Sequence, residues 1–124
     1  MGHRVLIVDD SRLARMSIAR LLDVLRPDWT RVESANSAEA MACHPFDAID
    51  VALLDFNMPG RDGLELAAEM HAVRPDMPMA IISANSQDEI VARTKAIGAG
   101  FLLKPLTQQA LSEFLDAIEP RLAG

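Results

Sequence analysis

Four short apolar runs of this sequence end in side chains that can bind a cation or an anion. Asp9 and Asp10 follow one run, and Asp55, Ser83 and Lys104 each follow another. Each residue alone is a weak signal, because Asp favours turns and helix caps and Ser and Lys are common in solvated loops. Together they bring carboxylate, hydroxyl and ammonium groups to the ends of four predicted strands.

The charges of this set favour a divalent cation. Three carboxylates and one ammonium sum to −2, and crowded like charges raise each other's pKa values. Hard oxygen ligands suit Mg²⁺, which keeps several waters and seldom uses a cage built from protein alone. Mg²⁺, with Mn²⁺ able to replace it, would bring the sum near zero. One carboxylate would then be free to attack and the ammonium would be free to meet an anion.

The elements that must position these residues alternate along the chain. Apolar runs rich in branched residues predict strands at residues 5–8, 31–34, 51–54, 79–82 and 101–103. Four of the runs are continuous, which is typical of parallel strands covered on both faces, whereas the polar run at 31–34 predicts an edge strand. Parallel sheets bind ligands beyond the carboxyl ends of their strands.

Helical spacing separates the apolar runs. Ile18, Leu21, Leu22 and Leu25 stand at i, i+3, i+4 and i+7, with Ser11 as the expected N-cap. Further helices are predicted at about residues 37–43, 66–73, 88–97 and 107–120, the last capped by Thr107. Strand–helix alternation predicts an α/β fold with a parallel sheet and helices on both faces.

Composition bounds the class of protein. The 124 residues predict one domain over 1–124, and the net charge of −6 argues against phosphate neutralisation in nucleic acid and against binding to an anionic membrane. No apolar run approaches the ~20 residues of a membrane span, and no signal peptide is recognisable. The single cysteine excludes an internal disulfide. We expect a soluble, cytoplasmic domain.

Five motifs in order resemble the receiver domain of two-component response regulators, in particular the stand-alone, chemotaxis-regulator-like kind. They are Val8-Asp9-Asp10-Ser11, Leu54-Asp55-Phe56-Asn57-Met58-Pro59-Gly60, Asp62-Gly63-Leu64-Glu65-Leu66, Ser83-Ala84 and Gly98-Ala99-Gly100-Phe101-Leu102-Leu103-Lys104-Pro105. The resemblance covers essentially the whole chain. It implies a flavodoxin-like (βα)5 fold with strand order 2-1-3-4-5.

The resemblance also implies the role of each residue at the site. Asp55 would accept a phosphoryl group as an acyl phosphate. Asp10, Asp55 and the backbone carbonyl of Asn57 would ligate Mg²⁺, and Asp9 would act largely through water. Ser83 and Lys104 would hold phosphoryl oxygens.

Two further positions carry implied conformational roles. Phe101 would be the aromatic switch that turns inward when Ser83 moves toward phosphate, and plain core packing is the alternative. The Lys104–Pro105 peptide would be cis and would aim the ammonium inward. Many relatives have Tyr at this position. This chain has Phe101, which has no hydroxyl to reach a partner.

The helix over residues 11–26 also offers a docking strip. At about 100° per residue, Met16 lies nearly opposite the stripe that faces the sheet, with Arg12 and Arg20 one turn to either side. A solvated basic face is the alternative interpretation. Receivers resemble one another in presenting this helix to the protein that carries the donor histidine.

The function that follows is a signalling switch. It would accept a phosphoryl group from a histidine kinase or histidine phosphotransfer protein and change the face that binds an output protein, which the sequence does not identify. We expect a stand-alone switch, because no output domain fits in the residues that follow the last predicted helix. A relay intermediate or phosphate sink would use the same chemistry. An aspartyl-nucleophile phosphatase is a remote alternative, because Asn57 stands where that class needs an acidic residue. Neither nucleic acid nor membrane is an expected partner.

Overall fold

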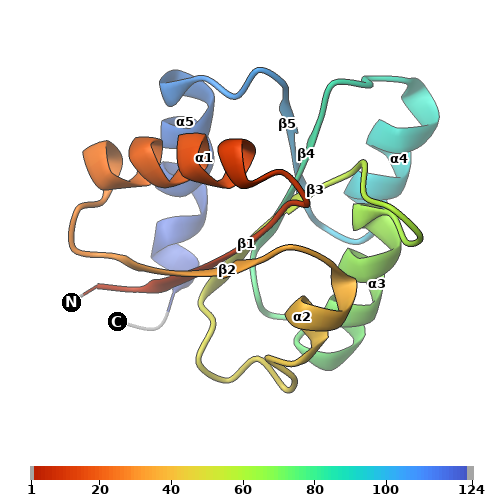
Figure 1. Ribbon diagram of the computed structural model, residues 1–124, viewed down its shortest axis with the longest axis horizontal. Coiled ribbons are helices and arrows are strands. Elements are labelled where there is room, and N and C mark those ends of the chain that lie inside the picture. Colours follow the sequence, from red (N-terminus) through yellow and green to blue (C-terminus); the bar gives the residue numbers. More distant parts are fainter. Residues whose placement is uncertain (1, 123–124) are drawn as a thin grey trace.

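A computed structural model describes residues 2–122 and contains alternating strands and helices (Figure 1). In chain order these are β1 (Arg4–Val8), α1 (Arg12–Leu25), β2 (Thr30–Ser34), α2 (Ser37–Met41), β3 (Val51–Asp55), α3 (Gly63–Val73), β4 (Met79–Ser83), α4 (Asp88–Ala96), β5 (Gly100–Leu103), α5 (Gln108–Ile118) and a 3₁₀ turn (Glu119–Arg121). Each predicted strand and helix is present, and every boundary lies within three residues of the predicted one.

The five strands form one parallel sheet in the order β2-β1-β3-β4-β5, which confirms the predicted topology. Every residue of β3 and β4 is buried, as their continuous apolar runs require. The edge strand β2 is mostly exposed, in agreement with its polar sequence. The order places the ends of β1, β3, β4 and β5 next to one another.

Two apolar layers sandwich the sheet, and each layer takes alternate residues of the strands. Helices α1 and α5 cover one face, where Ile18 and Leu22 meet Leu111 and Leu115. Helices α2, α3 and α4 cover the other face, where Met70 is fully buried. Each buried side chain of this size contributes about 1.5–3 kcal/mol relative to exposure.

Local capping explains where most helices begin. The hydroxyls of Ser11 and Thr107 accept N–H bonds from Ala14 and Ala110, as the sequence predicted. Helix α3 has a full capping box, in which Asp62 accepts from the Glu65 N–H and Glu65 accepts from the Asp62 N–H. This box fixes the first turn of α3 directly after the loop that leaves β3.

The buried stripe of α1 differs in part from the one predicted. Ile18, Ala19 and Leu22 are buried, whereas Leu21 and Leu25 are only half-buried. The centre of the buried face lies closer to Leu22, because α5 packs beside α1 and covers that side.

The loop from α2 to β3 contains features that the sequence did not predict. The His44–Pro45 peptide is cis, and Phe46 adopts φ 68° although it is not glycine. The Phe46 ring is fully buried, and its carbonyl oxygen accepts a 2.6 Å bond from Arg74 Nη1. Burial and this bond hold a backbone conformation that a bulky residue rarely adopts.

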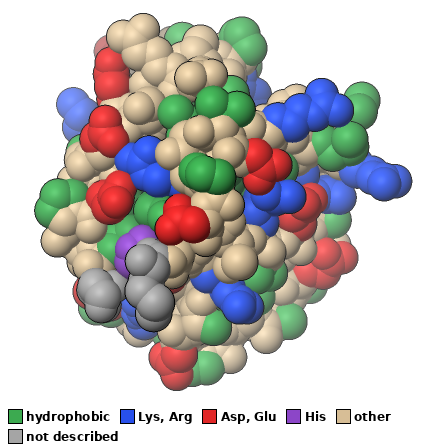
Figure 2. Space-filling model, turned by 90° about the vertical axis from the view of Figure 1, so that its left-hand side faces the viewer, with side chains coloured by type: hydrophobic (Ala, Val, Ile, Leu, Met, Phe, Trp, Pro, Cys, Tyr) green, Lys and Arg blue, Asp and Glu red, His purple; other side chains and the backbone are tan. Residues whose placement is uncertain are grey.

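Charges of both signs are interspersed over the face that Figure 2 shows, and hydrophobic groups there lie in separate patches. Several ion pairs join elements of the fold, among them Arg26 with Asp116 and Glu119, and Arg31 with Asp23. Exposed pairs of this kind contribute little to stability. None of the helices among residues 2–122 is both long enough and apolar enough to cross a bilayer.

Candidate functional site

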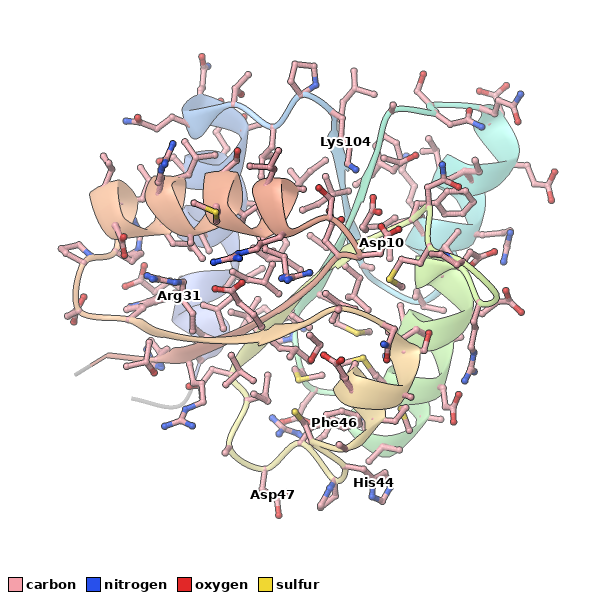
Figure 3. All side chains as sticks on the ribbon, in the orientation of Figure 1. Asp10, Arg31, His44, Phe46, Asp47 and Lys104 are labelled. Carbon is pink, nitrogen blue, oxygen red and sulfur yellow. The ribbon has the colours of Figure 1, made fainter. Side chains whose placement is uncertain are left out.

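The strand ends bring the predicted acidic residues together at one edge of the sheet. One carboxylate oxygen from each of Asp9, Asp10 and Asp55 lies within 4.8 Å of the other two. Asp9 and Asp55 are buried and Asp10 is exposed. Figure 3 shows Asp10 and Lys104 at this same edge. The parallel order of β1 and β3 explains the cluster, because adjacent parallel strands end side by side.

Lys104 is the cation of the site. Its Nζ lies 2.7 Å from Asp55 Oδ1 and 3.8 Å from Asp9 Oδ2. Burial lowers the pKa of Lys104, but the neighbouring Asp55 carboxylate outweighs that effect and raises the pKa above its ordinary value of 10.5. The ammonium therefore stays charged over the range in which the carboxylates are ionised.

The donor set suits a hard divalent cation. Asp55 Oδ1 is sealed from solvent and receives no well-aligned hydrogen bond from residues 2–122, so its contact with Lys104 is one of charge. Three crowded carboxylates face one ammonium, which leaves negative charge uncompensated. Oxygen ligands with an exposed member, Asp10, that water can reach fit the coordination that Mg²⁺ prefers.

Asp9 is nearly sealed from solvent, at 2 % exposure. Burial raises the pKa of its carboxyl above 3.8, although the Ser11 N–H, 2.9 Å from Asp9 Oδ1, favours the charged form. The Asp55 charge raises this pKa further. The ionised Asp9 therefore costs stability unless a cation compensates for it.

Asp9→Asn is expected to increase the free energy of unfolding at pH 7 in the presence of a chelator. The folded-state pKa of Asp9 is raised, so its contribution to stability is full below pH 3.8 and is lost as pH rises through the folded-state pKa. Asn keeps the oxygen that accepts from Ser11 and cannot ionise. Urea unfolding from pH 4 to 7 should show a smaller loss of stability for the variant, and an identical profile would contradict the expectation.

A cavity of about 160 Å³ opens beside Asp55. Its lining comprises Asp55, Phe56, Asn57, Ser83, Ala84, Asn85 and Lys104. The Ser83 hydroxyl donates to the Asn85 carbonyl at 3.1 Å and accepts from the Asn85 N–H at 2.9 Å. Ser83 is thus committed to its own turn, and it must leave the Asn85 carbonyl to donate to a ligand in the cavity.

Phe101 and Pro105 flank Lys104 in the chain. Phe101 is half-buried against the core of the α3 and α4 layer and is not among the residues that line the cavity. The Lys104–Pro105 peptide is cis, as the resemblance implies. The Lys104 N–H donates to the Ser83 carbonyl at 2.9 Å, which ties the end of β5 to β4.

The predicted docking strip lies on α1, outside the cavity. Arg12 and Arg20 are exposed, and 38 % of Met16 is accessible. Leu13, which the sequence analysis did not single out, is 75 % exposed and extends the apolar part of this face.

Arg15 occupies a different position from the other arginines of α1. Its side chain reaches back to Asp9 and Glu33. The helical period, which puts Arg15 beside Leu22 and opposite Leu13, was the signal that could have separated it from the exposed arginines.

The fold and the strand-end site define a receiver domain. The family model of the response regulator receiver domain matches residues 5–116, and the chain belongs to that family. A structure of chemotaxis protein CheY4 from Vibrio cholerae superimposes with a TM-score of 0.81 at 28 % identity, over 95 % of this chain and 99 % of that one. A CheY-like receiver domain from Methanospirillum hungatei gives a TM-score of 0.87 at 24 % identity, over 98 % of this chain and 97 % of that one, and supports the fold alone.

Curated relatives are regulators of greater length. The positive alginate biosynthesis regulatory protein of Pseudomonas aeruginosa is 38 % identical over 115 residues, which are 90 % of this chain and 45 % of that protein. The transcriptional regulatory protein PdtaR of Mycobacterium tuberculosis is 33 % identical over 120 residues, or 94 % of this chain and 55 % of that protein. The chain thus spans about half the length of these relatives. The family model and these relatives place this chain in two-component signalling.

Proposed function

We propose that this chain is a phosphorylation-dependent switch whose phosphoacceptor is Asp55. The observation that carries the proposal is the Asp55 carboxylate itself, buried beside two other carboxylates, 2.7 Å from an ammonium and open to a cavity. An Asp55 oxygen attacks the phosphorus of a phosphohistidine on a histidine kinase or phosphotransfer protein. An O–P bond forms, the N–P bond breaks, and the imidazole leaves with the electron pair of that bond.

Asp10, Asp55 and the Asn57 carbonyl would hold Mg²⁺ or Mn²⁺, with Asp9 acting through water. The cation supplies charge neutralisation between the carboxylates and an incoming phosphoryl group. Lys104 binds one phosphoryl oxygen, and to do so it exchanges its contact with the Asp55 carboxylate for one with the product.

Ser83 and Phe101 convert the modification into a change of surface. The Ser83 hydroxyl leaves the Asn85 carbonyl and donates to a phosphoryl oxygen. Its movement opens space toward which Phe101, half-buried on the adjacent strand β5, turns inward. The output protein would then meet a different face of the domain.

Two alternatives differ in partner or in class. A relay intermediate or phosphate sink would use the same residues and differ only in where the phosphoryl group goes next. An aspartyl-nucleophile phosphatase requires an acid–base residue two positions after the nucleophile, and Asn57 cannot fill that role. We therefore favour the switch, which supports only its own phosphorylation and dephosphorylation, over a separate enzyme.

The test of this function is labelling by a small acyl-phosphate donor. Intact-mass measurement should show one phosphoryl group gained in the presence of Mg²⁺ or Mn²⁺ and little gain with a chelator. Equal labelling with the divalent ion and with the chelator would contradict the proposed site.

Met16→Asp is expected to slow transfer from the cognate histidine phosphodonor at least tenfold, which is about 1.4 kcal/mol in the barrier. The variant puts a charge in the centre of an exposed strip with an apolar middle and an arginine rim, where a donor helix would dock. Stopped-flow or gel-based transfer assays measure the rate. Labelling by the small acyl-phosphate donor should stay nearly unchanged.

Val24→Asp is the matched control for that experiment. Val24 is 65 % exposed on the same helix but lies two turns further from the acidic edge. We expect the Val24→Asp variant to accept the phosphoryl group from the histidine donor at the parent rate. The docking strip would be wrong if both variants slowed transfer from the histidine donor equally. It would also be wrong if Met16→Asp slowed labelling by the two donors equally.

A further inference from the structure

Arg15 makes two contacts that join three elements. Its Nη1 donates to the Asp9 carbonyl oxygen at 2.6 Å, and its Nε donates to Glu33 Oε1 at 3.1 Å. The side chain is only 15 % exposed, although it is a cation on the first turns of α1. It therefore connects α1 to the loop after β1 and to strand β2.

The Asp9 carbonyl belongs to the peptide that joins the two acidic residues. The Asp9 N–H donates to the Ser34 carbonyl at 3.1 Å, so neighbouring groups hold the backbone of Asp9 on both sides. The Asp10 carboxylate makes no hydrogen bond or ion pair with another residue of the described part of the chain. The backbone therefore sets the point from which this carboxylate projects, and the Arg15 bond orients the peptide that precedes Asp10.

Two electrostatic costs oppose a cation at the position of Arg15. A cation near a helix N-terminus opposes the helix dipole, and the first turn of α1 contains no acidic residue to offset it. A cation bonded to the backbone of Asp9 also repels any divalent ion that the neighbouring carboxylates bind. The bonds to the Asp9 carbonyl and to the Glu33 carboxylate offset these costs.

We propose that Arg15 is a positioning residue for the divalent-ion site, acting through the Asp9–Asp10 peptide. The inference rests on the proposed function, because it presumes that the acidic cluster binds Mg²⁺. Groups that orient metal ligands typically change metal affinity by 10–100-fold when they are removed. Both bonds of Arg15 are to protein atoms, so its role would be indirect and not that of a ligand.

Removal of Arg15 has two effects on Mg²⁺ affinity, and they act in opposite directions. Removal of a cation near the site strengthens Mg²⁺ binding by Coulomb's law alone. Loss of the oriented Asp10 carboxylate weakens Mg²⁺ binding. Arg15→Met is expected to raise the dissociation constant for Mg²⁺ about tenfold, against the direction of the charge effect.

The experiment measures Mg²⁺ affinity without phosphorylation. Urea unfolding of the full chain at increasing Mg²⁺ gives the dissociation constant from the gain in stability, and isothermal titration calorimetry checks it. Each unfolding curve without metal verifies that the variant is folded. Arg15→Gln, which keeps a polar side chain at this half-buried position, takes the place of Arg15→Met if the latter does not fold, with the same expectation.

Two matched variants separate the contributions. Glu33→Gln removes the charge of the pair but leaves the bond to Asp9, so the dissociation constant should change less than about threefold, well below the effect of losing the positioning residue. Arg31→Met removes a cation that lies on β2, the strand of Glu33, and pairs with Asp23 of α1. Mg²⁺ should bind this variant as tightly as the parent or more tightly.

Arg15→Met with unchanged or tighter Mg²⁺ binding would overturn the positioning role. A parent chain that gains no stability from Mg²⁺ would instead overturn the proposed function, so the two failures are distinguishable.

Discussion

Asp55→Asn is expected to abolish phosphorylation by a small acyl-phosphate donor in the presence of saturating Mg²⁺. The amide keeps the size of the side chain but has no anionic oxygen to attack phosphorus. It also removes one of the three carboxylates that surround the cation site. Intact-mass measurement over time gives the result directly, with the parent chain gaining one phosphoryl group and the variant gaining none.

The fold should survive this substitution. Asp55 ends β3 and is buried, and an isosteric amide removes negative charge from a crowded cluster. Asp62→Asn is the matched control, because it makes the same chemical change at the N-cap of α3, and Asn is as good a cap as Asp. The control should label at the parent rate. An Asp55→Asn variant that labels as fast as the parent would show that another residue is the nucleophile.

Gly63→Ala is expected to cost about 3 kcal/mol of stability, at the upper end of the cost of overpacking. A Cβ on Gly63 would lie 2.2 Å from the carbonyl oxygen of Asp55, a backbone atom that a side-chain rotation cannot move aside. The Gly63 N–H also donates to the Phe56 carbonyl at 2.9 Å. The start of α3 would have to move away from the end of β3, and the phosphoacceptor would move with it.

Gly60→Ala separates this close approach from glycine's conformational freedom. Gly60 has φ +79°, but a Cβ there would meet nothing within 4 Å. Gly60→Ala should lower the free energy of unfolding by about 1 kcal/mol, because alanine disfavours the left-handed backbone conformation. Urea unfolding compares the two variants, and labelling by the small donor should fall much further in Gly63→Ala. A smaller loss of stability in Gly63→Ala than in Gly60→Ala would contradict the packing at the end of β3.

The elements of the fold could be predicted from local patterns. Continuous apolar runs identified β1, β3, β4 and β5, since a strand covered on both faces needs apolar residues throughout. Ser11 and Thr107 were recognisable as caps from residue type and position. The strand order required the family resemblance, because periodicity shows which face of an element is buried and not which neighbour covers it.

The chemistry of the site was also predictable in kind. A residue that ends a parallel strand or directly follows it must lie at the ligand-binding edge. Asp55 and Ser83 end their strands, and Asp9 and Lys104 directly follow theirs. That inference needs only the position of the residue relative to its own strand.

Only the tertiary structure decided which side chains meet. Lys104 lies against Asp55, 49 positions earlier in the chain, and the Arg15 side chain reaches from α1 back to the Asp9 carbonyl. Arg74 holds the unusual Phe46 backbone across 28 positions. Local sequence determines the period and the ends of helices and strands, because those depend on neighbouring residues. Partners this far apart are brought together by the packing of both helical layers on the sheet, which no local pattern contains.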